Sequence, residues 1–108
     1  MLLPEITSAD LKNRLTAGED IQLIDVREPA EYEICALPHS ILVPLGEINR
    51  QTAAIATNKP VVVICHHGFR SAQAIQFSSQ RYGFSNLINL KGGIHAWALQ
   101  TDPTMPTY

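Results

Sequence analysis

The chain has 108 residues, which is long enough to bury one hydrophobic core and too short for two. Hydrophobic residues make up 45% of it and charged residues 17%, so it has the composition of a folded globular chain and not of a disordered one. A net charge of −2 gives no basic excess that would attract nucleic acid or an anionic membrane surface. We therefore expect one domain over residues 1–108, with no nucleic-acid partner and no membrane partner.

The sequence carries no signal for export or membrane insertion. No apolar run approaches the roughly 20 residues that a membrane span requires. The first five residues lack the basic stretch and long apolar core of a signal peptide. We therefore expect a cytoplasmic protein, in which the two cysteines, Cys35 and Cys65, are reduced rather than joined in a disulfide.

The first predicted elements are a helix and a strand. A helix opens within residues 6–11, where Thr7 can cap it and Asp10 suits the positive end of its dipole, and Gly18 can end it. The mostly apolar residues 21–26 then predict a strand in a sheet that is covered on both faces.

The middle of the chain alternates in the same way. Pro29 suits the first position of a short helix that extends to Ile34, and residues 41–43 predict a short strand that Pro44 ends. Apolar and β-branched side chains then recur at helical spacing, which predicts an amphipathic helix over residues 45–56.

The last third carries the clearest strand. Residues 61–64 are four consecutive β-branched side chains, which predict a buried parallel strand. Residues 72–82 contain no Gly or Pro and can form a helix. Residues 86–90 predict another strand and residues 94–99 a last helical turn or two, whereas the tail from about 100 to 108 holds too many breakers for regular structure.

This alternation predicts an α/β fold, in which a central parallel sheet of about five strands has helices on both faces. Such sheets bind ligands beyond the carboxyl ends of their strands. Asp25 lies near the end of one predicted strand, Cys65 ends another, and Gly92 and Gly93 follow a third. We therefore expect these three segments to converge at one edge of the sheet.

Cys65 is the candidate nucleophile at this edge. It precedes Gly68, which permits a tight loop, and a helix whose N-terminus favours the negatively charged thiolate. Four residues separate Cys65 from Arg70, so a small ring of loop N–H groups, with a guanidinium on its far side, could receive an anion. The alternative is a buried small hydrophobic side chain, which is the usual environment of a free cysteine.

Three motifs carry a resemblance to a known family. The letters CxxGxRS at residues 65–71 resemble the active-site loop of the rhodanese family of sulfurtransferases. DVREPxEY at residues 25–32 resembles the first signature of that family, and GGIxAW at residues 92–97 resembles its last. The resemblance spans about residues 5–100 and implies the three-layer rhodanese-like domain.

The resemblance also implies an activity, the transfer of sulfane sulfur in two steps. Cys65 attacks a donor, such as thiosulfate or a protein persulfide, and becomes a persulfide. A thiophilic acceptor, such as cyanide, a thiol or a sulfur-carrier protein, then takes the outer sulfur. No cofactor is expected. The letters DPxxPxY at residues 102–108 are similar to the end of rhodanese modules fused to enzymes that activate sulfur-carrier proteins. A cysteine desulfurase or a sulfur-carrier protein is therefore a candidate partner.

The loop after Cys65 supplies the expected substrate-binding residues, because its N–H groups would stabilise negative charge on the outer sulfur. These residues are His66, His67, Gly68, Phe69, Arg70 and Ser71. Arg70 can bind an anion or brace the loop, and Ser71 can cap the helix or contact the donor. Proton transfer by either histidine stays open, although exposed side chains are favoured. By resemblance, Asp25 and Arg27 support the site without doing chemistry, but a surface charge pair is the alternative.

Other assignments are disfavoured. A metal site is one of them, because adjacent ligands in a tight loop cannot easily converge on one ion. Its candidate ligands are Cys35, His39, Cys65, His66 and His67. Cys35 stands where the rhodanese pattern usually carries glycine, and we expect it to be a packed small side chain rather than a resolving thiol.

Two other functions remain as alternatives. A phosphatase or arsenate reductase also uses a cysteine loop that ends in arginine, but those phosphatases place five residues between the two, where this chain has four. A non-enzymatic interaction module is the other alternative. The presence of Cys65, Gly68 and Arg70 argues against it.

Overall fold

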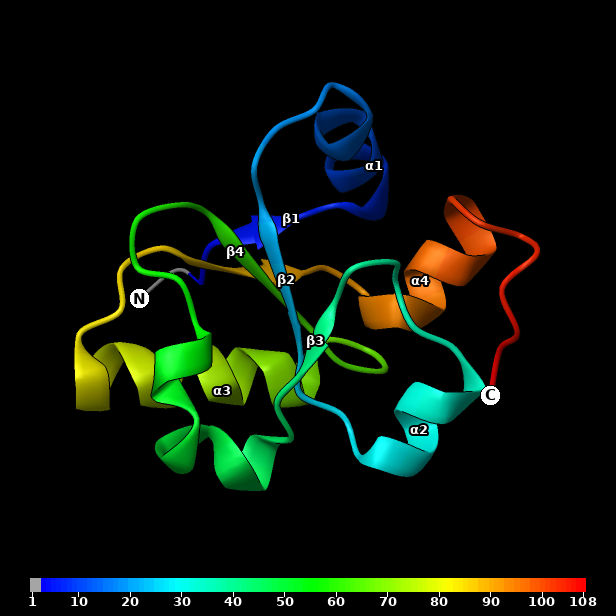
Figure 1. Ribbon diagram of the computed structural model, residues 1–108. Coiled ribbons are helices and arrows are strands. Elements are labelled where there is room, and N and C mark those ends of the chain that lie inside the picture. The colour runs from blue at the N-terminus through cyan, green and yellow to red at the C-terminus, as the bar shows by residue number, and fades with distance from the viewer. Residues whose placement is uncertain (1–2) are drawn as a thin grey trace.

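The computed structural model describes residues 3–108 and contains one sheet of five parallel strands (Figure 1). The strand order is β1-β5-β4-β2-β3, which confirms the predicted parallel sheet. The strands are β1 (Glu5–Ile6), β2 (Gln22–Asp25), β3 (Ile41–Leu42), β4 (Val61–Ile64) and β5 (Leu87–Leu90). β1 is an unpredicted edge strand, since two residues are too few to show an alternating pattern. Residues 1–2, where the segment tested for a signal peptide begins, lie outside the described residues.

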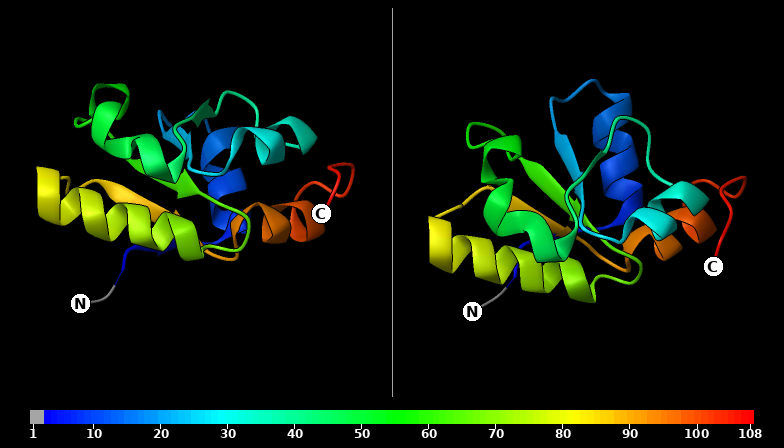
Figure 2. Two further views of the ribbon diagram at one scale, coloured as in Figure 1. Left: turned by 90° about the horizontal axis from the view of Figure 1, so that it is seen from below. Right: turned by 60° about the horizontal axis from the view of Figure 1, so that its bottom comes forward.

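Helices cover both faces of the sheet (Figure 1, Figure 2). The α-helices are α1 (Ser8–Thr16), α2 (Pro29–Ile34), α3 (Phe69–Tyr82) and α4 (Gly93–Gln100). Successive side chains of β4 point to opposite faces. Val62 and Ile64 pack with residues of α1 and α4, whereas Val61 and Val63 pack with residues of α3. Two covered faces explain why this strand is apolar throughout.

The strand register brings the ends of the central strands together. Asp25, the last residue of β2, pairs with Ile64, the last residue of β4. On the other side of β4, Val63 pairs with Asn89 of β5. Cys65 therefore leaves the sheet beside the ends of β2 and β5, at the edge where parallel sheets bind ligands.

Residues 45–56 differ from the prediction. Two short 3₁₀ helices, η1 (Leu45–Arg50) and η2 (Thr52–Ala54), replace the single amphipathic helix. Gln51 separates them with φ −126° and ψ 26°. Gly46 in the first turn and β-branched residues further along weaken helical propensity, so the apolar contacts decide the path. Ile48 and Ile55 are both buried against the face of the sheet that α3 covers.

The helix after Cys65 begins earlier than predicted. α3 starts at Phe69 rather than Ala72, so Arg70 and Ser71 lie in its first turn. Gly68 is the N-cap residue, and its φ of +102° turns the loop directly into the helix. The alternative that Ser71 caps the helix is therefore wrong.

Other predicted termini are confirmed. Thr7 caps α1 and accepts a hydrogen bond from the N–H of Asp10 at 3.1 Å. Pro29 is the first residue of α2, and Gly83 ends α3 in the left-handed conformation. Residues 101–108 follow α4 as turns and bends.

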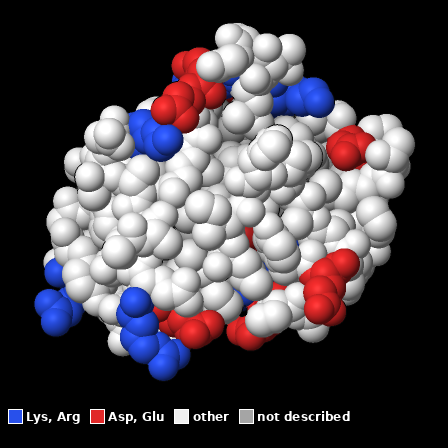
Figure 3. All heavy atoms as spheres, viewed as in Figure 1, with Lys and Arg blue, Asp and Glu red and all other residues white. Residues whose placement is uncertain are grey.

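The surface shows no large region of one charge on the face drawn in Figure 3. Charged side chains lie mostly around the rim of that face, and uncharged atoms fill its centre. Within residues 3–108, no helix combines the length and the apolar character that crossing a membrane requires.

α4 begins in close contact with the loop that follows β4. The N–H of Ile94 donates to the carbonyl oxygen of Cys65 at 2.8 Å, and that of His95 donates to the carbonyl oxygen of His66 at 3.1 Å. Gly93 has a φ of +64°, and a Cβ atom on it would collide with both of these carbonyl groups. Only glycine allows this approach.

We therefore expect Gly93→Ala to lower the free energy of unfolding by about 2–4 kcal/mol, because positive-φ strain adds to a backbone collision. Urea denaturation measures the loss. Gly46→Ala is the matched control, since a Cβ there meets nothing within 4 Å, and it should change stability by less than about 1 kcal/mol. Equal losses in the two variants would contradict the close approach.

Candidate functional site

Cys65 lies at the end of β4 with its sulfur held by polar groups. The residue is only 1% exposed. The N–H of Gly68 donates to Cys65 Sγ at 3.0 Å, and Ser71 Oγ lies 3.3 Å from the same sulfur. A main-chain N–H aimed at sulfur stabilises negative charge there. Of the predicted loop residues, Gly68 and Ser71 are thus the two in direct polar contact with the sulfur.

Asn89 of β5 lies behind this pair and was missed by sequence reasoning. Its Oδ1 accepts a hydrogen bond from Ser71 Oγ, and its Nδ2 donates to the carbonyl oxygen of Gly68 at 3.2 Å. Asn89 is 3% exposed. The available signal is a polar residue inside an otherwise apolar strand, because a buried amide requires hydrogen-bond partners.

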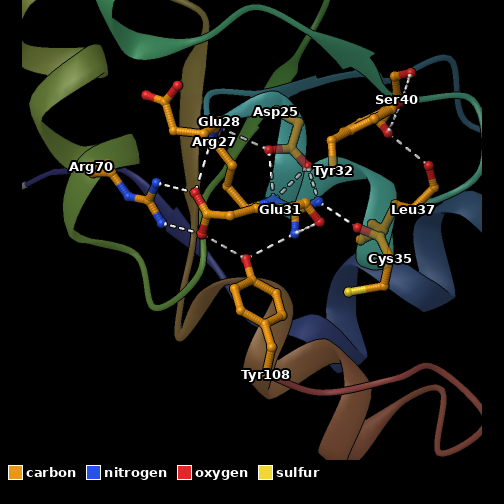
Figure 4. A network of polar contacts seen from close by, with 10 residues as sticks. All are labelled: Asp25, Arg27, Glu28, Glu31, Tyr32, Cys35, Leu37, Ser40, Arg70 and Tyr108. Carbon is orange, nitrogen blue, oxygen red and sulfur yellow. Dashed lines mark hydrogen bonds and ion pairs between the residues drawn. The ribbon is translucent and has the colours of Figure 1, made fainter.

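Arg70 is tied to α2 (Figure 4). Its Nη1 and Nη2 donate to the two carboxylate oxygens of Glu31, at 2.6 and 2.9 Å. The hydrogen bonds from Arg70 lower the pKa of Glu31 from 4.5 to about 2, and the same bonds raise the pKa of Arg70. Two parallel charge-assisted bonds of this kind hold both partners in one geometry. Arg70 thus braces the first turn of α3 against α2.

Tyr108, at the end of the tail, joins the same network (Figure 4). Its hydroxyl donates to Glu31 Oε2 at 2.9 Å and accepts from Arg27 Nη1 at 2.9 Å. Its ring stacks on that of His66, with the ring centroids 3.9 Å apart. Burial is the main cause that raises the pKa of Tyr108. Sequence reasoning missed this residue, because a segment without regular structure has no period that places its side chains.

Asp25 and Arg27 form a buried pair rather than the surface charge pair considered as an alternative. Both side chains are 0% exposed, and Arg27 Nη2 lies 2.7 Å from Asp25 Oδ2. Burial opposes the charge of Arg27, but the hydrogen bonds that it donates to Asp25 and Tyr108 prevail and raise its pKa. Arg27 also donates to the carbonyl oxygens of Glu31 and Cys35, at 3.2 and 2.6 Å. The pair therefore fixes α2 and the turn after it.

Cys35 and Cys65 are both free thiols. Cys35 packs in the core on the side of α1 and α4, with Leu37 among its neighbours, whereas Cys65 belongs to the core on the side of α3. This packing of Cys35 agrees with the expected small buried side chain.

The histidines of the loop meet a third histidine from α4. The ring centroids of His66 and His67 are 4.0 Å apart, and His95 lies 5.0 Å from His67. Burial, followed by the charge of His67, lowers the pKa of His66. His67 is exposed, and Phe69 is 79% exposed. Among residues 3–108, no three His, Cys, Asp or Glu side chains are arranged to hold a metal ion.

The candidate site does not lie in the cavity of about 580 Å³ that the structure contains. That cavity lies on the side of α1, between Leu15, Leu37 and Trp97, and no residue from 65 to 71 lines it. The chemistry of the Cys65 loop, rather than an enclosed volume, identifies the candidate site.

Comparison with known proteins gives one consistent answer. The chain is 37% identical over 97 residues to a sulfurtransferase of Allochromatium vinosum, and the match covers 90% of each protein. It is 37% identical over 105 residues to the probable adenylyltransferase/sulfurtransferase MoeZ of Mycobacterium tuberculosis. That match covers 95% of this chain and 26% of MoeZ, so the chain spans about a quarter of the length of this relative.

Solved structures agree with the sequence relatives. A rhodanese-related protein from Thermoplasma volcanium superposes with a TM-score of 0.80 at 34% identity, over 91% of this chain and 93% of that one. A rhodanese-like domain protein from Staphylococcus aureus superposes with a TM-score of 0.83 at 26% identity, over 98% of this chain and 99% of that one. The family described as Rhodanese-like domain matches residues 7–100. The predicted resemblance is confirmed, and the chain belongs to the rhodanese-like domain family.

Proposed function

We propose that the chain is a sulfurtransferase that carries sulfane sulfur on Cys65. The observation that carries this proposal is the position of the thiol at the end of β4, with the N–H of Gly68 aimed at its sulfur. The relatives support it, since one is named a sulfurtransferase and another, YrkF of Bacillus subtilis, a putative sulfur carrier protein.

The transfer takes two displacement steps on sulfur. The Cys65 thiolate attacks the outer sulfur of thiosulfate, the donor's sulfur–sulfur bond breaks, and sulfite leaves with the electron pair. The enzyme is left as a Cys65 persulfide whose negative charge lies on the outer sulfur. Cyanide then attacks that sulfur, thiocyanate leaves, and the Cys65 thiolate returns. The electrons balance within donor and acceptor, so neither step needs a cofactor.

We assign substrate binding to the main chain of residues 66–71. Loop N–H groups near Cys65 would stabilise the charge on the outer sulfur, as an oxyanion hole does for oxygen. Arg70 contributes by fixing the loop to α2 through Glu31. Asp25 and Arg27 support the same region by fixing α2 and the turn after it, and they do no chemistry.

The physiological donor and acceptor are proposed as classes. A protein persulfide is an alternative donor to thiosulfate, and a thiol or a sulfur-carrier protein is an alternative acceptor to cyanide. The exposed ring of Phe69 beside the loop suits contact with a protein, such as a cysteine desulfurase or a sulfur carrier. We propose that this exchange takes place in the cytoplasm, where both thiols stay reduced.

Phosphate chemistry fits the site less well. A phosphatase loop needs its arginine for the phosphate dianion, but here the carboxylate of Glu31 occupies both terminal nitrogens of Arg70. The loop is also one residue shorter between cysteine and arginine than in those phosphatases. Both features favour an attack on sulfur.

Cys65→Ser should abolish sulfur transfer from thiosulfate to cyanide, with a loss of about 10³-fold or more, because a hydroxyl cannot form the persulfide. The assay is thiocyanate formation. Intact-mass spectrometry after thiosulfate treatment should show one added sulfur atom on the wild type and none on the variant.

Cys35→Ala is the matched control and should keep both the added sulfur and activity within about 3-fold of the wild type. Sulfur loading of Cys65→Ser would place the nucleophile elsewhere. A wild type that never gains sulfur would favour an interaction module, and release of phosphate from p-nitrophenyl phosphate without thiocyanate would favour a phosphatase.

Glu31→Gln tests the brace through its pH dependence. The folded-state pKa of Glu31 is about 2 and its ordinary value is 4.5, so the unfolded chain takes up the proton first as the pH falls. The stabilisation is therefore present above pH 4.5 and is lost toward pH 2. We expect Glu31→Gln to lower the free energy of unfolding by about 1–2 kcal/mol at pH 7.

Denaturant titrations between pH 7 and pH 2.5 should show this difference shrink in the acid range. Glu33→Gln, an exposed change on the same helix, should leave stability within about 0.5 kcal/mol at every pH. A difference between wild type and Glu31→Gln that is constant with pH would refute the ionic brace.

A further inference from the structure

A line of buried polar contacts lies behind Cys65 and has no role in the two displacement steps as written above. Ser71 Oγ lies 3.3 Å from Cys65 Sγ and donates its hydrogen bond to Asn89 Oδ1. Asn89 Nδ2 donates to the carbonyl oxygen of Gly68 at 3.2 Å and to Glu5 Oε2 at 3.4 Å. Ser71 is 0% exposed and Asn89 is 3% exposed, so protein groups set the directions of these bonds.

The partners of Asn89 fix which way its amide points. The carbonyl oxygen of Gly68 can only accept, and so can the carboxylate of Glu5. A flipped amide would place Oδ1 against two acceptors and leave its own N–H₂ group facing Ser71. The NH₂ group therefore faces Gly68 and Glu5, and Oδ1 faces Ser71.

The orientation of Asn89 in turn fixes the hydroxyl proton of Ser71. A hydroxyl has one proton to donate and two lone pairs that accept. Because Asn89 Oδ1 can only accept, the Ser71 proton points to Asn89 and a lone pair of Ser71 Oγ faces Cys65 Sγ. The hydroxyl can accept a hydrogen bond from the Cys65 thiol, but it has no proton left for the thiolate.

We propose that Asn89 is a positioning residue that withholds the Ser71 hydroxyl proton from the sulfur of Cys65. The contacts of Ser71 and Gly68 with the sulfur then act differently. The N–H of Gly68 supplies the donor for negative charge, whereas Ser71 supplies an acceptor for the thiol proton.

This arrangement matters for sulfur transfer, and here the inference rests on the proposed function. A thiolate with fewer donors is scarcer but more nucleophilic, because nucleophilicity falls as the anion becomes more stable. In the persulfide the negative charge lies on the outer sulfur, so a second hydrogen-bond donor to the inner Sγ would add little stabilisation. Withholding the proton therefore disfavours the free thiolate and leaves the loaded form unaffected.

Other charged groups surround the sulfur, and every variant below leaves them in place. Arg70 lies on α3 and is paired with Glu31 of α2. Glu5 of β1 accepts a hydrogen bond from Asn89, which is connected to the sulfur through Ser71. The nearby titratable rings are His66 and His67 of the loop, His95 of α4 and Tyr108 of the tail. Differences between variants thus report on the Ser71 hydroxyl.

The test measures the amount of Cys65 thiolate and needs no sulfur donor. The ultraviolet absorbance of each protein is compared at neutral pH with that of its Cys65→Ala counterpart, so that tyrosines and Cys35 cancel. Ser71→Ala should raise the thiolate fraction about 2- to 5-fold, because the thiol loses its acceptor. Asn89→Leu should raise it about 5- to 10-fold, because the freed hydroxyl can turn and donate to the thiolate.

The double variant gives the sharpest result, because the effect of Ser71→Ala should reverse its sign. In the Asn89→Leu background, Ser71→Ala removes a donor and should lower the thiolate fraction. A lower thiolate fraction in Ser71→Ala alone would show that Ser71 already donates to the sulfur, and an unchanged fraction would show that Ser71 does not act as an acceptor for the thiol. Either result would overturn the proposal. A lower or unchanged thiolate fraction in Asn89→Leu would overturn the proposal as well.

Two control variants separate this effect from a general loss of packing. Ser78→Ala removes another buried serine of α3, and Asn86→Leu removes an amide just before β5 that donates to the carbonyl groups of Ala56 and Lys59. Both should leave the thiolate fraction unchanged. If Asn89→Leu does not fold, the proposal is decided by whether Ser71→Ala alone raises or lowers the thiolate fraction. Failure of sulfur loading in the wild type would refute the proposed function without changing these titrations.

Discussion

The contact between the first turn of α4 and the loop after β4 sets the direction of the peptide groups around Cys65. In a trans peptide the C=O and N–H bonds point in opposite directions. The carbonyl groups of Cys65 and His66 accept hydrogen bonds from α4, so the N–H groups of the next residues, His66 and His67, point away from α4. Gly93 makes this possible, since any side chain would push the two segments apart. α4 therefore fixes the orientation of the first two peptide groups of the loop.

The charged side chains near the loop are paired with one another. Arg70 gives both terminal nitrogens to Glu31, and Tyr108 and Arg27 complete the network around that carboxylate. An incoming group would therefore meet main-chain N–H dipoles and the N-terminus of α3 more than a free guanidinium. Such dipoles favour one negative charge on a sulfur atom. A phosphate dianion, which relies on an arginine fork, would have to displace a paired carboxylate first.

The fold could be predicted from the sequence because its strongest signals are local. The four consecutive β-branched residues at 61–64 favour a buried strand, which the structure contains as β4, and the position of Cys65 and Gly68 after it places the thiol before a helix. The prediction of one helix over residues 45–56 was wrong, because the spacing of the apolar residues also fits two 3₁₀ helices. The tertiary contacts of Ile48 and Ile55 decide between one helix and two. Asn89 and Tyr108 could not be assigned, because their side-chain hydrogen-bond partners lie at least 18 and at least 77 residues away in sequence. Contacts at such separations have no periodic signature.

Asn89 links the geometry of the loop to the reactivity of its sulfur. A buried amide in the middle of an apolar sheet is unfavourable unless its donors and its acceptor are all satisfied, and here they are. The same side chain holds the carbonyl oxygen of Gly68, whose N–H points at Cys65 Sγ. Gly68 can serve both partners because its φ of +102° turns the two peptide groups that flank it in the required directions. The polar groups around the sulfur are thereby held in place by β5, an inner strand of the sheet, as well as by the loop itself. Because strands are less mobile than loops, this attachment to β5 favours fixed directions for the hydrogen bonds at Cys65.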